Sequence, residues 1–286
     1  MKQAVLNPVY RKRLLRHRIG IALSVSAMAI GLFFLGCILL TLLVKGFDAL
    51  SLNLFIHDTP AQGTPDGGIR NAIVGSLMIV GLATFISTPI GILAGIYLAE
   101  YGEENKFAQV TRFVTDIMLS APSIVLGMFV WAMYVDYAKH FSGYAGSIAL
   151  SLIAIPVVVR TTDNMLRLVP TSLLEAAFAL GAPRWKVATM VRLKAVRAGV
   201  VTGVLLAVAR IAGETAPLMY TAMNNQFFTT NMNTEMANLP MWILQFAMSS
   251  DKDYKALAWA TALLLTLGVL LLNVLARNVF SQKTPK

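Results

Sequence analysis

The sequence has very little cysteine, histidine or charge. It contains one cysteine, Cys37, and three histidines in 286 residues. One cysteine excludes an intramolecular disulfide and a thiolate metal cage, and the histidines are too far apart for ligand spacing. Charged residues make up 13% of the chain, against about 25% in an average soluble protein. The low charge, together with an apolar fraction of 57%, excludes a soluble enzyme and a disordered chain, and the scarce cysteine and histidine argue against metal chemistry.

The sequence also lacks the elements of a catalytic subunit. No Gly-x-x-x-x-Gly-Lys-Ser/Thr phosphate loop occurs anywhere, so the chain supplies no Walker A element. No plausible pairing of a nucleophile with a base appears in the loops. We therefore expect that the chain is not an enzyme by itself.

Apolar residues take the place of the missing charge. They make up 57% of the chain, and the mean hydropathy is +0.67. A membrane-spanning helix needs about 20 mostly apolar residues. The runs that fit are Ile19–Val44, Asn71–Leu98, Phe113–Val135, Ala145–Val159, Ala198–Ala222 and Leu257–Ala276. The fold class that they predict is an all-α integral membrane protein with six transmembrane helices.

The basic residues predict how these helices are oriented. Eighteen Lys and Arg residues lie on the side of the two termini, and five lie on the other side. The positive-inside rule places the N-terminal segment 1–18 and the C-terminal segment 277–286 in the cytoplasm. Topology thus accounts for the net charge of +10 without nucleic acid. The first run, 19–44, is longer than the core of a signal peptide, about 7–15 residues, which favours a retained anchor.

The cytoplasmic segment 160–197 has the pattern of a helix, a turn and a second helix. Gly181 fits the C-terminal stop of the first helix, and Pro183 fits the first turn of the second. A rigid helix of this kind can dock a cytoplasmic partner. Glu175 has a second interpretation, because Ser172-x-x-Glu175 fits a capping box. Both roles are compatible with each other.

This segment resembles the EAA loop of ABC-transporter permeases. The matching residues are Glu175, Ala176, Ala177 and Gly181, followed by Val191 and Leu193. Lys194 stands where that family usually has proline. The resemblance implies the type I ABC importer permease fold, in which this loop between spans four and five inserts a coupling helix into a groove of an ATPase subunit. It also implies that the first four matching residues are the coupling residues.

The fifth run contains two charges, Arg210 and Glu214. A charge at the membrane centre costs about 2.5–3.5 kcal/mol on insertion scales, and two charges four residues apart on a helix can pair. One hypothesis is a structural ion pair, within this helix or with a partner subunit. The other is that Arg210 serves an anion pathway or its gating. Glu214 would then orient Arg210 or pair with another subunit, and Thr215 would add a hydroxyl.

The block Arg210–Pro217 resembles the R-x-A-G-E-T-A-P block of the phosphate permeases among the ABC importers. The stretches 58–78 and 119–130 resemble the same family. The resemblance implies an inner-membrane permease subunit of an ATP-driven phosphate importer, with its permease domain over 71–276. It also implies two PstB-like ATPase subunits that hold ATP and Mg, a second, PstC-like permease, and a PstS-like extracytoplasmic binding protein. No cofactor is expected in this chain.

Two other functions stay open. One is an ABC permease for sulfate, molybdate or a small organic solute, because the substrate does not follow from physical chemistry alone. The other is an ion-coupled secondary transporter or channel, in which Arg210 and Glu214 would form a coupling pair. The second alternative leaves the EAA spacing unexplained.

The outer segment 224–254 contains an apolar stretch, 239–247, that is too short to span a membrane. We expect a short helix at the outer interface, anchored there by Trp242. It would serve either as a lid over the bundle or as part of a docking surface for a binding protein.

Overall fold

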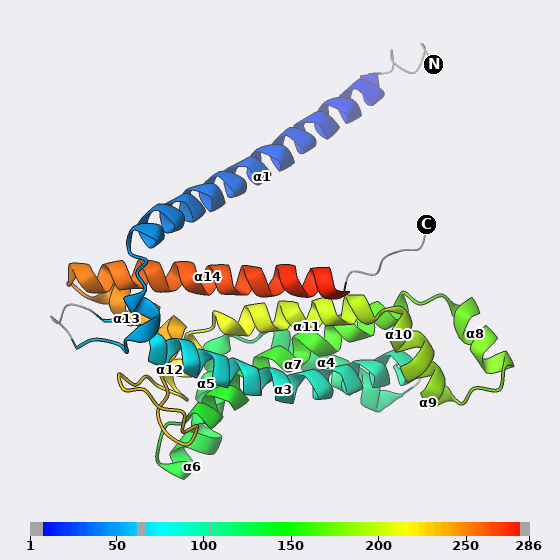
Figure 1. Cartoon of the computed structure of the whole chain (residues 1–286). Coiled ribbons are helices and arrows are strands. Elements are labelled where there is room, and N and C mark those ends of the chain that lie inside the picture. Colours follow the sequence, from blue (N-terminus) through cyan, green and yellow to red (C-terminus); the bar gives the residue numbers. More distant parts are fainter. Residues whose placement is uncertain (1–7, 62–66, 103–104, 281–286) are drawn as a thin grey trace.

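The computed structural model describes residues 8–61, 67–102 and 105–280, and within these ranges all regular structure is helical. Residues 1–7 and 281–286 of the two segments predicted to be cytoplasmic lie outside the described residues. Figure 1 shows long helices running roughly side by side, with α1 diverging from them. The long helices are α1 (Pro8–Asp48), α3 (Arg70–Tyr101), α7 (Gly143–Arg167), α11 (Arg197–Ala212) and α14 (Lys252–Phe280). Shorter helices join them.

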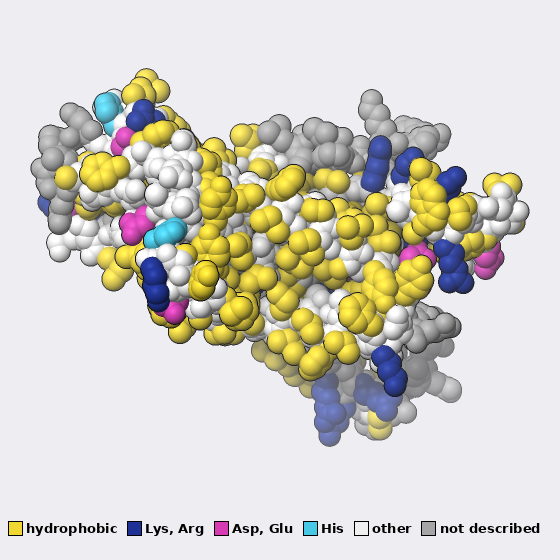
Figure 2. Space-filling model, turned by 90° about the horizontal axis from the view of Figure 1, so that it is seen from below, with side chains coloured by type: hydrophobic (Ala, Val, Ile, Leu, Met, Phe, Trp, Pro, Cys, Tyr) yellow, Lys and Arg dark blue, Asp and Glu magenta, His cyan; other side chains and the backbone are white. Residues whose placement is uncertain are grey.

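Four of the described helices, α1, α3, α7 and α14, are long and apolar enough to cross a membrane. Two bent helix pairs would raise the number of spans to six if each pair crosses once. The all-helical membrane fold is thus confirmed, and the count of six stays a prediction. Figure 2 shows hydrophobic side chains over the middle of one face, with charged side chains toward its ends.

Helix α7 forms the centre of the bundle. It packs most extensively against α3 and also against α11. Small residues allow the close contact with α3, because a Cβ atom at Gly91 would lie 2.6 Å from the Cβ of Val158. The same relation holds between Gly95 and Thr162. The two helices therefore form one tightly packed pair.

The third predicted span, 113–135, is wrong as one continuous helix. The chain forms α4 (Lys106–Ser120) and α5 (Ser123–Val130). The chain bends by 106° at the break between α4 and the helical stretch that starts with α5. The π-helical η2 (Trp131–Val135) and α6 (Asp136–Ala138) continue α5. Pro122 lies at the break, and its ring favours an extended conformation of the preceding residue. Ala121 is accordingly extended, with ψ at 137°.

The fifth predicted span, 198–222, is wrong at its C-terminal end. Helix α11 ends at Ala212, and a separate short helix, α12 (Ala216–Met219), follows. Glycine is a poor helix former, which weakens the helix at Gly213. Pro217 has no N–H, so it cannot donate to the carbonyl of Gly213 as a continuous helix would require. The break therefore falls between these two residues.

Helix α1 stands apart from the bundle. It contains the predicted run 19–44 and continues through the basic residues to Pro8, a length of about 60 Å. Almost all of its described side chains are exposed, including Cys37. Only its C-terminal end is held, where Lys45 lies 5.1 Å from the ring of Trp259 on α14. In a membrane, lipid or another subunit must cover this apolar helix.

The expected short helix in the outer segment is α13 (Leu239–Met248). The predicted interfacial role of Trp242 is wrong, because its side chain is only 4% exposed. Its ring stacks on Phe246 at 4.9 Å, and Phe246 in turn contacts Tyr254. Since α13 packs against α3 and α14, the indole belongs to the core.

The loop before α3 and the loop after α12 are joined by one buried amide. Helix α2 (Asn53–Ile56) and the loop after it lead to Asn71, whose Oδ1 accepts from the N–H and the hydroxyl of Thr59. Its Nδ2 donates to the carbonyls of Asn225 and Gln226, both at 3.0 Å. Arg70 adds a bidentate pair with Asp58. The loop before α3 and the loop after α12 are therefore tied together.

Candidate functional site

The helix, turn and helix predicted within the segment 160–197 are confirmed. The first helix is α8 (Thr171–Ala179). Gly181 follows with φ at +78°, and its N–H donates to the carbonyl of Phe178. The N–H of Ala182 donates to the carbonyl of Ala177 at 3.2 Å. These two bonds form a Schellman motif, which explains why a glycine stands at this position.

The second helical part begins directly after Pro183. It consists of α9 (Arg184–Lys186), the π-helical η3 (Val187–Arg192) and α10 (Leu193–Ala195). It meets α11 at a bend of 75°. Helix α8 packs on η3, so the turn folds the two parts back against each other.

The predicted capping box is not formed. Helix α8 begins at Thr171 with Pro170 at the N-cap position and no side-chain capping bond. Ser172 therefore lies inside the first turn rather than at the cap, and Glu175 is too far along to close the box. Glu175 is exposed, and no ion pair of its carboxylate is found among the described residues. Glu175 therefore does not serve as a capping residue of α8.

Helix α8 exposes an apolar surface at one extreme of the molecule (Figure 1). Glu175 and Ala176 are exposed, and Ala177 is half-buried. Leu180 is 89% exposed and Trp185 on the adjoining helix is 61% exposed. Side chains of this kind on a protruding helix are typical of a surface that a partner covers.

Arg210 and Glu214 lie together, but not on one helix. Arg210 is in the last turn of α11, and Glu214 follows in the bend after the helix has ended. The Nε of Arg210 lies 3.8 Å from Oε1 of Glu214, within ion-pair range and beyond hydrogen-bond range. Thr215 is the N-cap of α12 without a side-chain capping bond. The predicted pair is confirmed, and the predicted common helix face is wrong.

The surroundings leave Arg210 open to one side. Ala207 and Ile211 of α11 are buried against the bundle, whereas the Arg210 side chain is 44% exposed. Leu206, one turn earlier, is exposed in the same way. The face of α11 that carries Arg210 is thus available to a second subunit or to a water-filled pathway.

A second charged pair within the spans was not found by sequence reasoning. Nη1 of Arg160 on α7 lies 3.2 Å from Oδ1 of Asp116 on α4, and both side chains are about half exposed. The residues are far apart in the chain, so no spacing rule connects them. The available signal was that each is a charge next to or within an apolar run.

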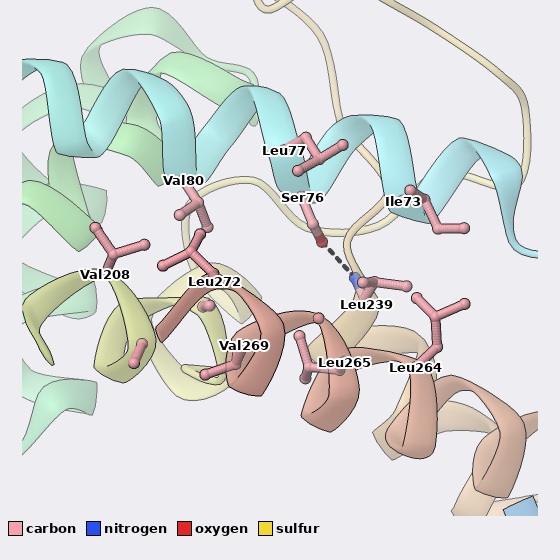
Figure 3. A pocket seen from close by; sticks show the side chains of 13 residues that line it. Ile73, Ser76, Leu77, Val80, Val208, Leu239, Leu264, Leu265, Val269 and Leu272 are labelled. Atoms are coloured by element: carbon pink, nitrogen blue, oxygen red, sulfur yellow. Dashed lines mark hydrogen bonds between the residues drawn. The ribbon is translucent and has the colours of Figure 1, made fainter. Parts of the chain in front are cut away.

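An apolar cavity beside these helices does not fit an anion. It has a volume of about 190 Å³ and lies between α3, α11 and α14 (Figure 3). Aliphatic side chains such as Leu77, Val208 and Leu265 line it. Its one hydroxyl, on Ser76, accepts from the N–H of Leu239 at 2.8 Å. Such a lining suits hydrocarbon, and it offers no positive charge to phosphate.

Comparison with known proteins agrees with this geometry. Residues 91–283 match the family described as binding-protein-dependent transport system inner membrane component. The fold is similar to a chain of the MetNI methionine ABC transporter in an inward-facing conformation, with a TM-score of 0.60 and 19% identity over 73% of this chain and 93% of that chain. It is also similar to a chain of a bacterial alginate ABC transporter, with a TM-score of 0.65 and 13% identity over 94% and 96% of the two chains. The fold is that of a type I ABC importer permease.

Relatives in sequence identify the family within this fold. The chain is 55% identical to the phosphate transport system permease protein PstA of Pasteurella multocida, over 97% of this chain and 99% of that relative. It is 54% identical to PstA of Yersinia pestis, over 94% and 91%. The helical bundle, from which α8 protrudes, and these relatives define a multi-pass inner-membrane permease subunit of the ABC importers. Within that class, the chain belongs to the family of phosphate transport system permease proteins named PstA.

Proposed function

We propose that this chain is the permease subunit of an ATP-driven importer of inorganic phosphate and forms the translocation pathway with a second permease. The observation that carries this proposal is the 55% identity to PstA over nearly the whole chain. The phosphate-family block at 210–217 supports it from within the sequence.

The proposed coupling residues are Glu175, Ala176, Ala177 and Gly181. Three features support this role: α8 protrudes, its apolar side chains are exposed, and Glu175 has no capping function. The small alanines allow close approach of another backbone. Closing of the ATPase dimer on ATP would move α8, and the spans would rock as rigid bodies to alternate access.

Arg210 is the proposed pathway or gating residue. A guanidinium can bind a phosphate oxygen pair, and one such group in an otherwise apolar span allows phosphate to leave again. The loose 3.8 Å contact supports a role for Glu214 as an orienting partner that can exchange. Thr215 would supply a hydroxyl beside them.

The partners and the orientation follow from the same proposal. Two PstB-like subunits would hold ATP and Mg, a PstC-like chain would complete the pore, and a PstS-like protein would deliver phosphate. The start of α1, the end of α14 and the coupling helix lie at one end of the molecule (Figure 1). This arrangement supports a cytoplasmic location for both termini. ATP hydrolysis would take place in the separate ATPase subunits.

The test is uptake of labelled phosphate at micromolar concentration in cells that depend on this chain. Sulfate and molybdate serve as unlabelled competitors, with ATP depletion and proton uncoupling as separate arms. Uptake that fails on ATP depletion alone and resists both competitors is the expected result. Competition by sulfate or molybdate would indicate a permease for another solute. Dependence on the proton gradient would indicate a secondary transporter.

A further inference from the structure

Arg192, the last residue of η3, joins the coupling segment to the spans. Its Nε donates to the carbonyl of Leu166 at the end of α7, at 2.9 Å. Its Nη1 donates to the carbonyl of Ala99 at 3.3 Å and to Oε1 of Glu100 at 2.8 Å, both on the last turn of α3. One guanidinium on η3 therefore bonds to two further helices, α7 and α3.

Burial strengthens the ion pair between Arg192 and Glu100. The Arg192 side chain is 11% exposed and Glu100 is 19% exposed, so water screens their attraction only weakly. A positive charge at the ends of α3 and α7 is also favoured by the helix dipoles and by the carbonyls left without intrahelical donors. Arginine suits the position because its planar fork reaches several acceptors at once.

The hydrogen bonds of Arg192 attach η3 to α3 and α7, the most extensively packed pair of helices in the bundle. Helices α3 and α7 approach closely along Gly91 and Gly95, so a displacement of one would be resisted by the other. Arg112 of α4 holds the same end of α3, donating to the carbonyls of Leu98 and Gly102. Its Nε lies 3.5 Å from Oδ2 of Asp163 on α7. These contacts of Arg112 strengthen the same end of the bundle, and none of them involves α8 or η3.

On the other side of the joint, α8 packs on η3. A polar cavity of about 610 Å³ lies beside this contact, and its lining includes Phe178 of α8, Glu100 of α3 and Arg192 itself. A force that an ATPase exerts on α8 would therefore pass through the packed contact with η3 and the bonds of Arg192. The cavity lies beside these contacts. A π-helical stretch such as η3 is often found at functional positions.

We propose that Arg192, with Glu100, is the positioning residue that transmits movement of the coupling helix to α3 and α7. This inference rests on the proposed function and adds the specific link through which the coupling acts. The pair is part of the transmission and contacts neither the solute nor ATP.

The test uses the complete transporter in proteoliposomes and compares R192Q, E100Q and the control K194Q. Lys194 is exposed, two residues along the same segment, and removal of its charge leaves the joint intact. We expect the number of solute molecules transported per ATP to fall about tenfold in R192Q and less in E100Q. ATP hydrolysis and assembly should stay near those of the wild type. A proportional fall of transport and hydrolysis, or normal coupling in both variants, would overturn the proposal.

A second measurement does not depend on which solute is carried. Spin labels at S172C on α8 and L93C on α3, in a C37S background, report the distance between the two helices. Both positions are exposed, and Cys37 is the one natural cysteine. We expect one narrow distance in the wild type with and without trapped nucleotide, and a broadened distribution in R192Q. An unchanged distribution in R192Q contradicts the joint, whereas absent phosphate uptake by the wild type contradicts only the proposed function.

Discussion

Gly127 of α5 lies directly against Pro217 of α12: a Cβ atom on Gly127 would be 2.5 Å from the Cα of Pro217. Pro217 is buried, and the neighbouring Leu218 belongs to the central core. This contact seats the segment that carries Glu214 and Thr215 on the bent third span. The position of the pair Arg210–Glu214 therefore depends on glycine at position 127, where a side chain would collide with Pro217.

The first prediction concerns this contact. G127A should destabilise the protein by about 1–3 kcal/mol, because the backbone of Pro217 cannot yield as a flexible side chain would. Thermal unfolding of the detergent-solubilised complex measures the effect. The control is G81A, since nothing lies within 4 Å of a Cβ at that helical glycine. Equal melting temperatures for G127A and the wild type would contradict the tight contact.

The second prediction concerns Arg210. R210Q should lower phosphate uptake by tenfold or more, about 1.4 kcal/mol or more, with normal assembly of the complex. R210K should retain part of the uptake, because it keeps the charge and loses the fork. Uptake and the yield of assembled complex are measured together. Failure of assembly in R210Q would instead favour the structural ion pair with Glu214.

The third prediction separates the two roles considered for Glu175. E175A should reduce the ATPase that co-purifies with the permease by about tenfold, as at an interface hot spot. S172A should have no such effect, because Ser172 does not cap α8. Quantified pull-down of the ATPase gives the answer. Equal losses in both variants would mean that the capping interpretation holds in the membrane.

The fourth prediction concerns the left-handed conformation of Gly181. A valine there should be strained by about 1–2 kcal/mol, although nothing lies within 4 Å of its Cβ. G181V should uncouple transport from ATP hydrolysis while the protein still inserts. G181N should preserve coupling, because asparagine tolerates a positive φ. Wild-type coupling in G181V would count against both the motif and the docking role.

The fifth prediction concerns the loop before α3 and the loop after α12. N71A leaves the buried Thr59 N–H without its partner, at about 1–3 kcal/mol, and removes the bonds to the carbonyls of Asn225 and Gln226. The loop 224–228 should then be cleaved faster by protease added on its side of the membrane. N231A, in an exposed part of the same segment, is the matched control. Equal cleavage in the two variants would show that Asn71 does not hold the loops together.

Much of the site could be predicted from sequence because its signals are local. The stop at Gly181 and the pairing of Arg210 with Glu214 depend on residues a few positions apart. The capping box was also a local pattern, yet it failed because the helix began earlier, at Thr171, than the pattern assumed. The buried position of Trp242 could not be predicted either, since hydropathy does not distinguish an interfacial ring from a core ring.

Sequence alone determined that the chain is a helical membrane protein, because apolar length and charge act along the chain and need no partner. Tertiary structure decided where the helices break. Pro89, Pro122 and Pro156 lie in similar apolar runs, yet α3 and α7 continue through the first and last, and only Pro122 separates two helices. Neighbouring helices decide whether a proline is accommodated. The pairs Arg192–Glu100 and Arg160–Asp116 likewise exist only after folding, because they join residues that no helical or loop spacing brings together.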